Sequence, residues 1–439
     1  MRRPGPEARV IPRYSLPEMA RLWTDEAKYA SWVRVEVLAC EAQARLGTVS
    51  EAELAAVRAG RVPTPEEVRE QERTRDHEVL AFLAAYTASI PDDAARRVHF
   101  GMTSYDLVDT ALGHTLAASC DLLLAATGRL LRALTTRAVE HWDTVCVART
   151  HGIHAEPTTF GQKLAGFAFG VHRSLERLRA ARTAVAVGTV SGPVGTYGSV
   201  DPFVEAYVCE ALGLGVEPVP TQVVARDRHA ELLGAVALLG AVVEQIGLEM
   251  RLLQRTEVRE VEEPRSSAYQ GSSAMPHKRN PTTSERLCGL ARLLRAGLGA
   301  ALEDVALWHE RDLAHSSVER VVLPDSLIAA HYQVTGAAEL IEGLRVFPDR
   351  MRANLEQTDG LIHSSTVMLH LMSTGSEREK AYRTVQDAAT ETWETGRHLR
   401  ETLRDRGIVT GDDLYDPARF LRSRHVMRQR LEELLHVEV

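Results

Sequence analysis

The sequence predicts an all-α protein whose centre is a bundle of long helices. Five amphipathic stretches contain no proline and run for twenty residues or more, whereas a globular helix averages about 11–12 residues. Alternating patterns typical of strands are scarce, and the chain has no internal repeat and no low-complexity tract. The five stretches are residues 107–139, 160–187, 227–258, 284–307 and 325–344.

The segments on either side of this bundle predict shorter helices. Residues 23–46 carry apolar side chains at helical spacing, and Pro63-Thr64-Pro65 interrupts the chain before the next helix. In the last ninety residues, breaks fall at Gly360, Gly375 and Gly407. We therefore predict three domains: an N-terminal helical domain (1–105), the central long-helix bundle (106–348) and a C-terminal helical domain (349–439).

A bundle of such long helices is wide on every face, and its own loops cannot cover it. Within 107–139, for example, Leu112, Leu116 and Leu123 recur at three- to four-residue multiples. Burial against copies of the same chain is the natural way to cover such helices, which predicts an oligomer.

The composition and charge of the chain argue against several classes of protein. The net charge is −8 with no sustained basic block, which disfavours nucleic-acid binding. The longest apolar run, 232–243, is shorter than a membrane span requires and predicts a buried core helix. The start of the chain lacks the apolar stretch of a secretory signal, and the five scattered cysteines favour neither a disulfide framework nor a zinc site. These features predict a soluble cytoplasmic protein without a membrane partner.

The most informative motif is GSSAMPHKRNP at 271–281. It places hydroxyl groups near Lys278, and only four of the 52 basic residues are lysines. A lysine where the chain nearly always uses arginine indicates chemistry that a guanidinium cannot copy. A solvated basic loop is the alternative. We favour a loop in which a serine is activated by its surroundings, with Asn280 as an orienting amide.

A second motif, RTHGIHAEPTT at 149–159, contains His151, His154 and Glu156. The spacing matches no standard zinc pattern, so a metal site is disfavoured. A histidine that caps a loop is one alternative. Two histidines beside a carboxylate and an arginine favour acid–base chemistry, because histidine titrates near neutral pH.

Two further motifs favour an anion. Residues 98–106 contain Thr103, Ser104 and Asp106 just before the first long helix, where they would cap the helix or hold a carboxylate or phosphate. Residues 309–320 contain Arg311, Ser316 and Arg320, a spacing suited to two guanidinium groups and a hydroxyl on one anion. A surface helix with ion pairs is the alternative for this last motif.

Together these motifs resemble the fumarase/aspartase superfamily. The forms AMPHKRNP, RTHGIHAEPTTFGQKLAG and WHERDLAHSSVER are most similar to the adenylosuccinate lyase family in its shorter bacterial form. The likeness runs from Arg13-Tyr14 to about Leu344, with weaker agreement through Thr384-Val385. It implies a three-domain, all-α homotetramer in which several copies of the chain share each active site. It also implies that no metal or organic cofactor is used.

The resemblance implies a β-elimination in purine biosynthesis. The family releases fumarate from adenylosuccinate, which leaves AMP, and from the succinylated aminoimidazole carboxamide ribotide. By resemblance Ser272 is the base that removes the Cβ proton, and His151 is the acid that protonates the departing nitrogen. Glu285 orients His151, while Lys278 and Asn280 hold the succinyl carboxylates.

The other site residues are assigned by the same resemblance. His77 matches a second active-site histidine of the family. The residues expected to contact substrate are Thr103, Ser104, Gln222 and Arg286, and those expected around the nucleotide phosphate are Arg13, Tyr14, Arg311, Ser316 and Arg320.

Four positions depart from the family pattern. Tyr105 stands where the family usually has a small residue, and Arg75-Asp-His-Glu78 keeps His77 with altered neighbours. Ala268-Tyr-Gln270 lacks a family glycine, and Ser364-Ser-Thr366 replaces Ser-Gln-Arg. These departures keep open a fumarate-releasing lyase for a different succinyl or aspartyl adduct, in secondary metabolism. A non-catalytic structural protein is disfavoured because no proposed catalytic group is missing.

Overall fold

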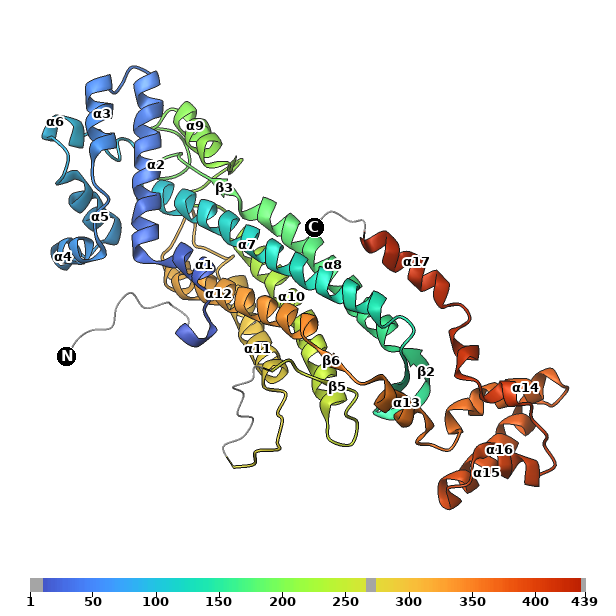
Figure 1. Ribbon diagram of the computed structural model, residues 1–439. Helices are drawn as coiled ribbons and strands as arrows, with labels where there is room; N and C mark the ends of the chain where they lie inside the picture. The colour runs from blue at the N-terminus through green and yellow to red at the C-terminus, as the bar shows by residue number, and fades with distance from the viewer. Residues whose placement is uncertain (1–10, 266–273, 436–439) are drawn as a thin grey trace. The chain divides into compact units, whose positions relative to one another are not determined.

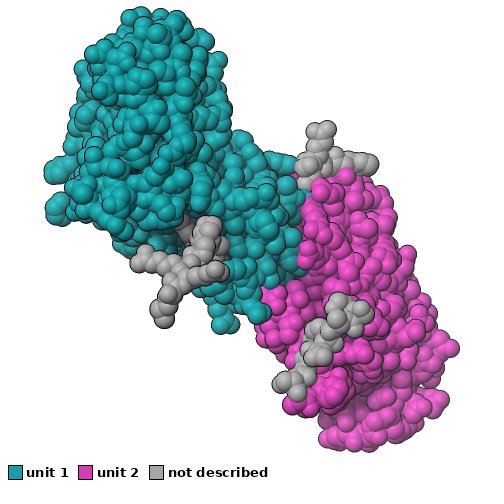
Figure 2. Space-filling view, turned by 60° about the vertical axis from the view of Figure 1, so that its left-hand side comes forward, with its two compact units in different colours: residues 1–128, 173–244, 287–336 teal, residues 129–172, 245–286, 337–439 magenta. Residues whose placement is uncertain are grey.

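The computed structural model describes residues 11–265 and 274–435, which form two compact units (Figure 2). Unit 1 comprises residues 1–128, 173–244 and 287–336, and unit 2 comprises 129–172, 245–286 and 337–439. Each of the five long helices contributes residues to both units, so these boundaries fall inside helices. The three-domain division at 105/106 and 348/349 stays a prediction.

The predicted all-α class is confirmed by the element order (Figure 1). The long helices are α7 (Ser104–Glu140), α8 (Phe160–Val185), α10 (Asp227–Gln254), α11 (Thr282–Glu303) and α12 (Ala314–Glu342). The remaining elements of unit 1 are η1 (Pro12–Tyr14), α1 (Pro17–Ala20), η2 (Arg21–Trp23), α2 (Asp25–Arg45), α3 (Glu51–Ala59), α4 (Pro65–Arg75), α5 (Glu78–Thr87), α6 (Asp92–Ala95), β3 (Val187–Gly188), α9 (Pro202–Leu212) and β4 (Gly215–Val216).

Unit 2 holds the other short elements. These are β1 (Val145–Thr150), β2 (Ile153–Thr159), β5 (Val261–Glu262), β6 (Arg345–Val346), α13 (Pro348–Glu356), η3 (Leu361–His363), α14 (Ser364–Ser373), α15 (Arg378–Thr395), α16 (Leu399–Asp405), η4 (Asp412–Tyr415), η5 (Pro417–Leu421) and α17 (Arg424–Leu435). Strands β1 and β2 form an antiparallel hairpin, β3 pairs with β4 in parallel, and β5 pairs with β6 antiparallel.

Helix α2 is central to unit 1, with α3 and α9 against it (Figure 1). Thr24 caps its N-terminus by accepting a hydrogen bond from Ala27 N at 3.2 Å. Its buried face meets Phe82 of α5, whose ring stacks on Tyr29 at 5.9 Å and meets Trp32 edge-on at 5.1 Å. Burial of these aromatic rings anchors α5 against α2.

One predicted helix has a wrong start, and one observed element is absent from the predictions. Residues 145–159 fold as a hairpin that the sequence patterns do not predict. Helix α12 begins at Ala314 and continues through Pro324, whereas the predicted helix began after that proline. A proline inside a helix removes one backbone hydrogen bond and crowds the preceding turn, but packing can still hold the helix together.

Helices α7 and α10 are long and apolar enough to cross a membrane. The shortness of the 232–243 run therefore does not decide whether the chain spans a membrane. In each of the two helices 56 % of the most apolar window is buried within the protein, a pattern that core helices of soluble proteins share. The five cysteine thiols are buried and free.

Candidate active site

The predicted site residues divide between the two units. Nine lie in unit 1, five lie in unit 2, and Ser272 lies outside the described residues. The nine are Arg13, Tyr14, His77, Thr103, Ser104, Gln222, Arg311, Ser316 and Arg320, and the five are His151, Lys278, Asn280, Glu285 and Arg286.

Thr103 and Ser104 lie at the N-terminus of α7, the end of a helix that favours an anion. Asp106 fixes this start, because its Oδ2 accepts from Thr103 N at 2.7 Å and its Oδ1 accepts from Ser191 N at 2.9 Å. Burial raises the pKa of Asp106 to about 6, although its backbone hydrogen bonds favour the ionised form. The predicted capping role therefore falls to the Thr103–Asp106 pair, and the Thr103 and Ser104 side chains remain half-buried.

The guanidinium of Arg311 lies over the ring of Tyr105, with Cζ 3.8 Å from the ring centroid. Its Nη1 donates to Gln222 Oε1 at 2.7 Å, and Gln222 Nε2 donates to Pro193 O at 2.8 Å. A cation–π contact of this kind contributes about 0.5–2 kcal/mol. Arg311 is thus held in place near the start of α7 and supplies the positive charge of this region. We call the group of residues around it the anion corner: Thr103, Ser104, Tyr105, Gln222 and Arg311.

Ser316 and Arg320 lie one helical turn apart on α12, and Arg320 Nε donates to Ser316 Oγ at 3.4 Å. Arg320 Nη1 also pairs with Glu78 at 2.6 Å, and the other oxygen of Glu78 receives Lys28 Nζ at 2.6 Å. Burial opposes the ionisation of Glu78, but Lys28 and Arg320 hold its pKa below the usual range. Together with apolar side chains these residues border a cavity of about 120 Å³.

His77 is the N-cap of α5, and its Nδ1 accepts a hydrogen bond from Leu80 N at 3.4 Å. Helix α4 ends at Arg75, and its C-cap Asp76 lies in the left-handed region (φ 49°), so the chain turns directly from one helix into the next. His77 is exposed, and Glu78, the altered neighbour noted in the sequence, is the residue that pairs with Arg320.

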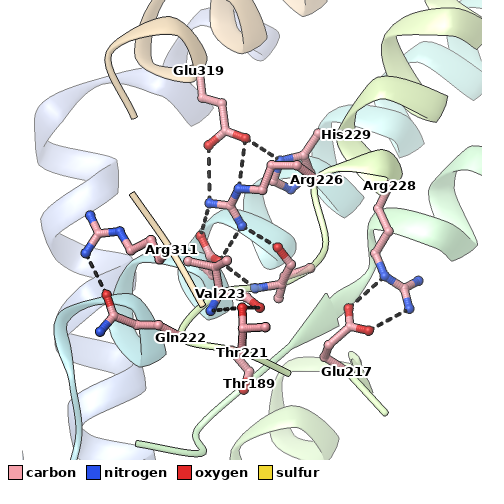
Figure 3. A network of polar contacts seen from close by, with 12 residues as sticks. Thr189, Glu217, Thr221, Gln222, Val223, Arg226, Arg228, His229, Arg311 and Glu319 are labelled. Atoms are coloured by element: carbon pink, nitrogen blue, oxygen red, sulfur yellow. Dashed lines mark hydrogen bonds and ion pairs between the residues drawn. The ribbon is translucent and has the colours of Figure 1, made fainter. Parts of the chain in front are cut away.

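A buried ion-pair network lies beside Arg311 and Gln222 of the anion corner (Figure 3). Arg226 donates to both oxygens of Asp109 at 2.6 and 2.9 Å and to Glu319 Oε2 at 3.3 Å. Burial opposes the ionisation of Glu319, but its hydrogen bond with His229 at 2.8 Å and the charge of Arg226 lower its pKa to about 2. The network joins α7 and α12 to the start of α10, which holds the segments around the corner in register.

Arg13 and Tyr14 lie in η1, where the Tyr14 ring meets Tyr332 of α12 edge-on at 5.6 Å. Arg13 is exposed and Tyr14 is half-buried. Both residues lie in unit 1 with the anion corner.

In unit 2, His151 lies at the tip of the β1–β2 hairpin. Thr150 pairs with Ile153, so His151 and Gly152 form a two-residue loop, and both have positive φ (55° and 81°). These angles are typical of a type I′ turn, whose twist matches the strands that it joins. The turn leaves the His151 imidazole exposed. Neighbouring His154 is half-buried, and burial followed by the charge of Arg149 lowers its pKa.

Lys278 and Asn280 follow the part of the signature motif that lies outside the described residues. Lys278 N donates to Met275 O at 3.0 Å, and its side chain is exposed. Between them, Arg279 pairs with Glu262 at 3.0 Å. Lys278 therefore lies at a backbone position fixed by its neighbours, with its ammonium group exposed for an anionic ligand.

Glu285 and Arg286 lie in the first turn of α11. The helix start is bound by Glu263, whose carboxylate accepts from Thr283 N at 3.0 Å and Ser284 N at 2.7 Å. Glu285 is exposed, and within the described chain no hydrogen bond or ion pair joins it to His151. The predicted orientation of His151 by Glu285 stays a prediction.

This set of groups suits acid–base elimination. The chain offers an exposed imidazole, an exposed ammonium group and several guanidinium groups arranged for anions. Among the residues that the structure describes, no group of three or more His, Cys, Asp or Glu side chains could hold a metal ion.

The sequence profiles of two families match the chain. One, described as a lyase, matches residues 13–294, and the other, described as an adenylosuccinate lyase C-terminus, matches residues 360–431. The adenylosuccinate lyase of Synechocystis sp. is 46 % identical over 431 residues, which cover 96 % of this chain and all of that protein. The chain belongs to the adenylosuccinate lyase family. The member from Bacillus subtilis is 45 % identical over 91 % of this chain and 93 % of its own length.

Solved structures agree with this placement. The fumarate lyase from Mesorhizobium sp. BNC1 superposes with a TM-score of 0.87 at 28 % identity, over 97 % of this chain and 99 % of that one. The 3-carboxy-cis,cis-muconate lactonizing enzyme from Pseudomonas putida gives 0.87 at 29 % identity, over 96 % and 97 %. The predicted family, the lyase class and the fumarase/aspartase fold are confirmed.

Sequence reasoning missed residues in and around the anion corner. It identified Tyr105 only as a departure and did not identify Arg226, Asp109 or Glu319 at all. The signal was the run Arg226-Asp-Arg-His229 at the start of a long helix, where four consecutive charged or titratable side chains need partners.

Proposed function

We propose that the protein catalyses β-elimination of fumarate from adenylosuccinate, which leaves AMP, and the same cleavage of the succinylated aminoimidazole carboxamide ribotide. The observation that carries this proposal is the anion corner: Arg311 is fixed over Tyr105 by Gln222, beside the N-terminus of α7. A guanidinium held in place beside the N-terminus of a helix suits the binding of an anionic group of the substrate.

The proposed reaction breaks one C–H and one C–N bond. Ser272 removes the Cβ proton of the succinyl group, and the electron pair forms the double bond of fumarate as the C–N bond breaks. His151 protonates the departing nitrogen, because an amide-like nitrogen anion is a poor leaving group. Lys278 and Asn280 stabilise the carboxylate charge that develops as the proton leaves.

The remaining roles follow the same scheme. Glu285 orients His151, and His77 supplies a second titratable group. Arg311, Ser316 and Arg320 bind the phosphate with Arg13 and Tyr14, and Thr103, Ser104, Gln222 and Arg286 contact the rest of the substrate. We propose a cytoplasmic homotetramer in which copies of the chain share each site, and no metal or organic cofactor.

The test is a fumarate-release assay. Purified full-length protein is mixed with adenylosuccinate, the loss of the succinyl-nucleotide absorbance is followed, and AMP and fumarate are measured by chromatography. We expect both products in equal amounts. A folded tetramer that releases no fumarate would refute the proposal.

A second candidate is fumarate release from a different succinyl adduct. Tyr105 favours it, because a large ring occupies the corner where the family usually has a small residue. The two candidates differ in whether the substrate carries a phosphate, so the arginines proposed to bind it discriminate between them.

Arg311→Ala and Arg320→Ala should each raise the KM for adenylosuccinate by roughly tenfold to a hundredfold, since a charge-assisted hydrogen bond contributes about 1.5–3 kcal/mol. Steady-state kinetics measures the effect. The matched control is Arg58→Ala, an exposed arginine paired with Glu41, for which KM should stay within about twofold. An unchanged KM in both site variants would favour a substrate without a phosphate.

A further inference from the structure

Three buried carboxylates lie on one short segment of unit 2, residues 258–263. Glu260, Glu262 and Glu263 are 1 %, 6 % and 3 % exposed. Each binds a different segment that carries proposed catalytic residues. We propose that this segment, which we call the acidic strand, positions the catalytic residues of unit 2. The inference deepens the proposed function, on which it rests.

Glu260 holds the hairpin that carries His151. Arg149, two residues earlier on β1, donates from Nη2 to Glu260 Oε1 at 2.6 Å and from Nη1 to Oε2 at 3.2 Å. Asn354 of α13 donates to the same carboxylate at 2.8 Å. A bidentate pair fixes orientation as well as distance, so Glu260 sets the direction in which the hairpin tip points.

Glu262 holds the end of the signature motif. Arg279 Nη1 lies 3.1 and 3.0 Å from its two oxygens, and Arg345 of β6 donates to Oε1 at 2.9 Å. Arg279 lies between Lys278 and Asn280, so its anchorage places both neighbours. Gln254 of α10 adds a hydrogen bond to Arg279 O at 3.1 Å.

Glu263 holds the start of α11. Its Oε1 accepts from Ser284 N at 2.7 Å and from Ser284 Oγ at 2.6 Å, and its Oε2 accepts from Thr283 N at 3.0 Å. A carboxylate at this end satisfies unpaired N–H groups and complements the helix dipole. Glu285 and Arg286 come next in the chain, so Glu263 sets their position.

The chemistry of these carboxylates favours positioning over simple stability. Burying a carboxylate is costly unless it is fully hydrogen-bonded, and apolar residues of similar size stabilise a core at least as well. Val258 and Val261, buried on the same segment, already supply apolar anchorage. The carboxylates add fixed geometry to three segments at once.

Single Glu→Gln variants at the three positions test the proposal. Glutamine keeps the size but removes the charge and turns one acceptor into a donor that faces other donors. We expect kcat to fall by roughly tenfold to a hundredfold with KM within about threefold, because small misplacement of reacting groups costs rate. The matched control is Glu257→Gln, an exposed carboxylate just before the acidic strand.

Amide hydrogen exchange in the full-length protein supplies a readout that needs no substrate. Exchange should rise about tenfold in 149–154 for Glu260→Gln, in 277–281 for Glu262→Gln and in 282–286 for Glu263→Gln, each without change in the other two segments. Uniformly faster exchange, or a local change with unaltered kcat, would overturn the proposal. If the wild-type protein does not act on adenylosuccinate, the proposed function fails, and the exchange pattern still decides whether the strand positions these segments.

Discussion

Replacing His151 with asparagine should lower kcat for adenylosuccinate by about 10²–10⁴ while the substrate still binds. A positioned general acid contributes a factor of this size, and the amide protons of asparagine are far too weakly acidic to protonate the departing nitrogen. Steady-state kinetics gives kcat, and equilibrium dialysis of substrate against the variant gives the binding affinity.

Asparagine is chosen because it preserves the hairpin. His151 and Gly152 both have positive φ, and Asn-Gly is among the sequences that a type I′ turn favours most. Loss of activity in His151→Asn is therefore a loss of chemistry rather than of structure.

His154→Asn on the same hairpin is the matched control, and we expect less than a tenfold change. His154 is half-buried within β2, whereas His151 is exposed at the tip. Loss of activity in His154→Asn with normal turnover in His151→Asn would move the acid to His154. Normal turnover in both variants would move the acid role to His77.

The long helices could be predicted because periodicity without proline is a local signal. Residues 107–139 and 227–258 lie almost within α7 and α10 as observed. The prediction of α12 is wrong at Pro324, where tertiary packing maintains a helix that local preference would interrupt. The hairpin is missed because Pro157 obscures the strand pattern, although a two-stranded hairpin accepts proline at an edge position.

The site could be predicted only one motif at a time. The sequence indicates Arg311 and Gln222, but nothing local shows that they meet or that Arg311 lies over the ring of Tyr105, 206 positions earlier in the chain. Buried ion pairs have no periodic signature. The run at 226–229 signals that charged side chains need partners, but the sequence does not show which residues pair in the Arg226 network or along the acidic strand. The sequence indicates which residues have the chemistry for the site, and the folded structure shows which other residues hold them in position.

Replacing Arg226 with methionine should lower the free energy of unfolding by about 3–5 kcal/mol. Arg226 and Asp109 are each 1 % exposed and Glu319 is 10 % exposed, so removing the guanidinium leaves two buried carboxylates without their cation. Urea unfolding at one fixed protein concentration measures the loss, since subunit association contributes to the stability of an oligomer. Arg73→Met, which breaks the exposed Arg73–Glu70 pair, is the matched control and should change stability by less than about 1 kcal/mol.

The loss in Arg226→Met should depend on pH, and its direction follows from Glu319. In the intact protein the pKa of Glu319 is about 2, below the ordinary value of 4.5. Its ionised form therefore contributes stability that is fully present above about pH 4.5 and is lost as the pH falls toward 2. In the variant, the charge of Arg226 no longer offsets the burial of Glu319, so the pKa of Glu319 rises. Acidification then protonates Glu319 and removes the cost of its unpaired buried charge. The difference in stability between variant and wild type should thus be largest at pH 7 and smaller at pH 4.5. A difference that grows on acidification would show that Arg226 acts through packing of its side chain and not through its charge.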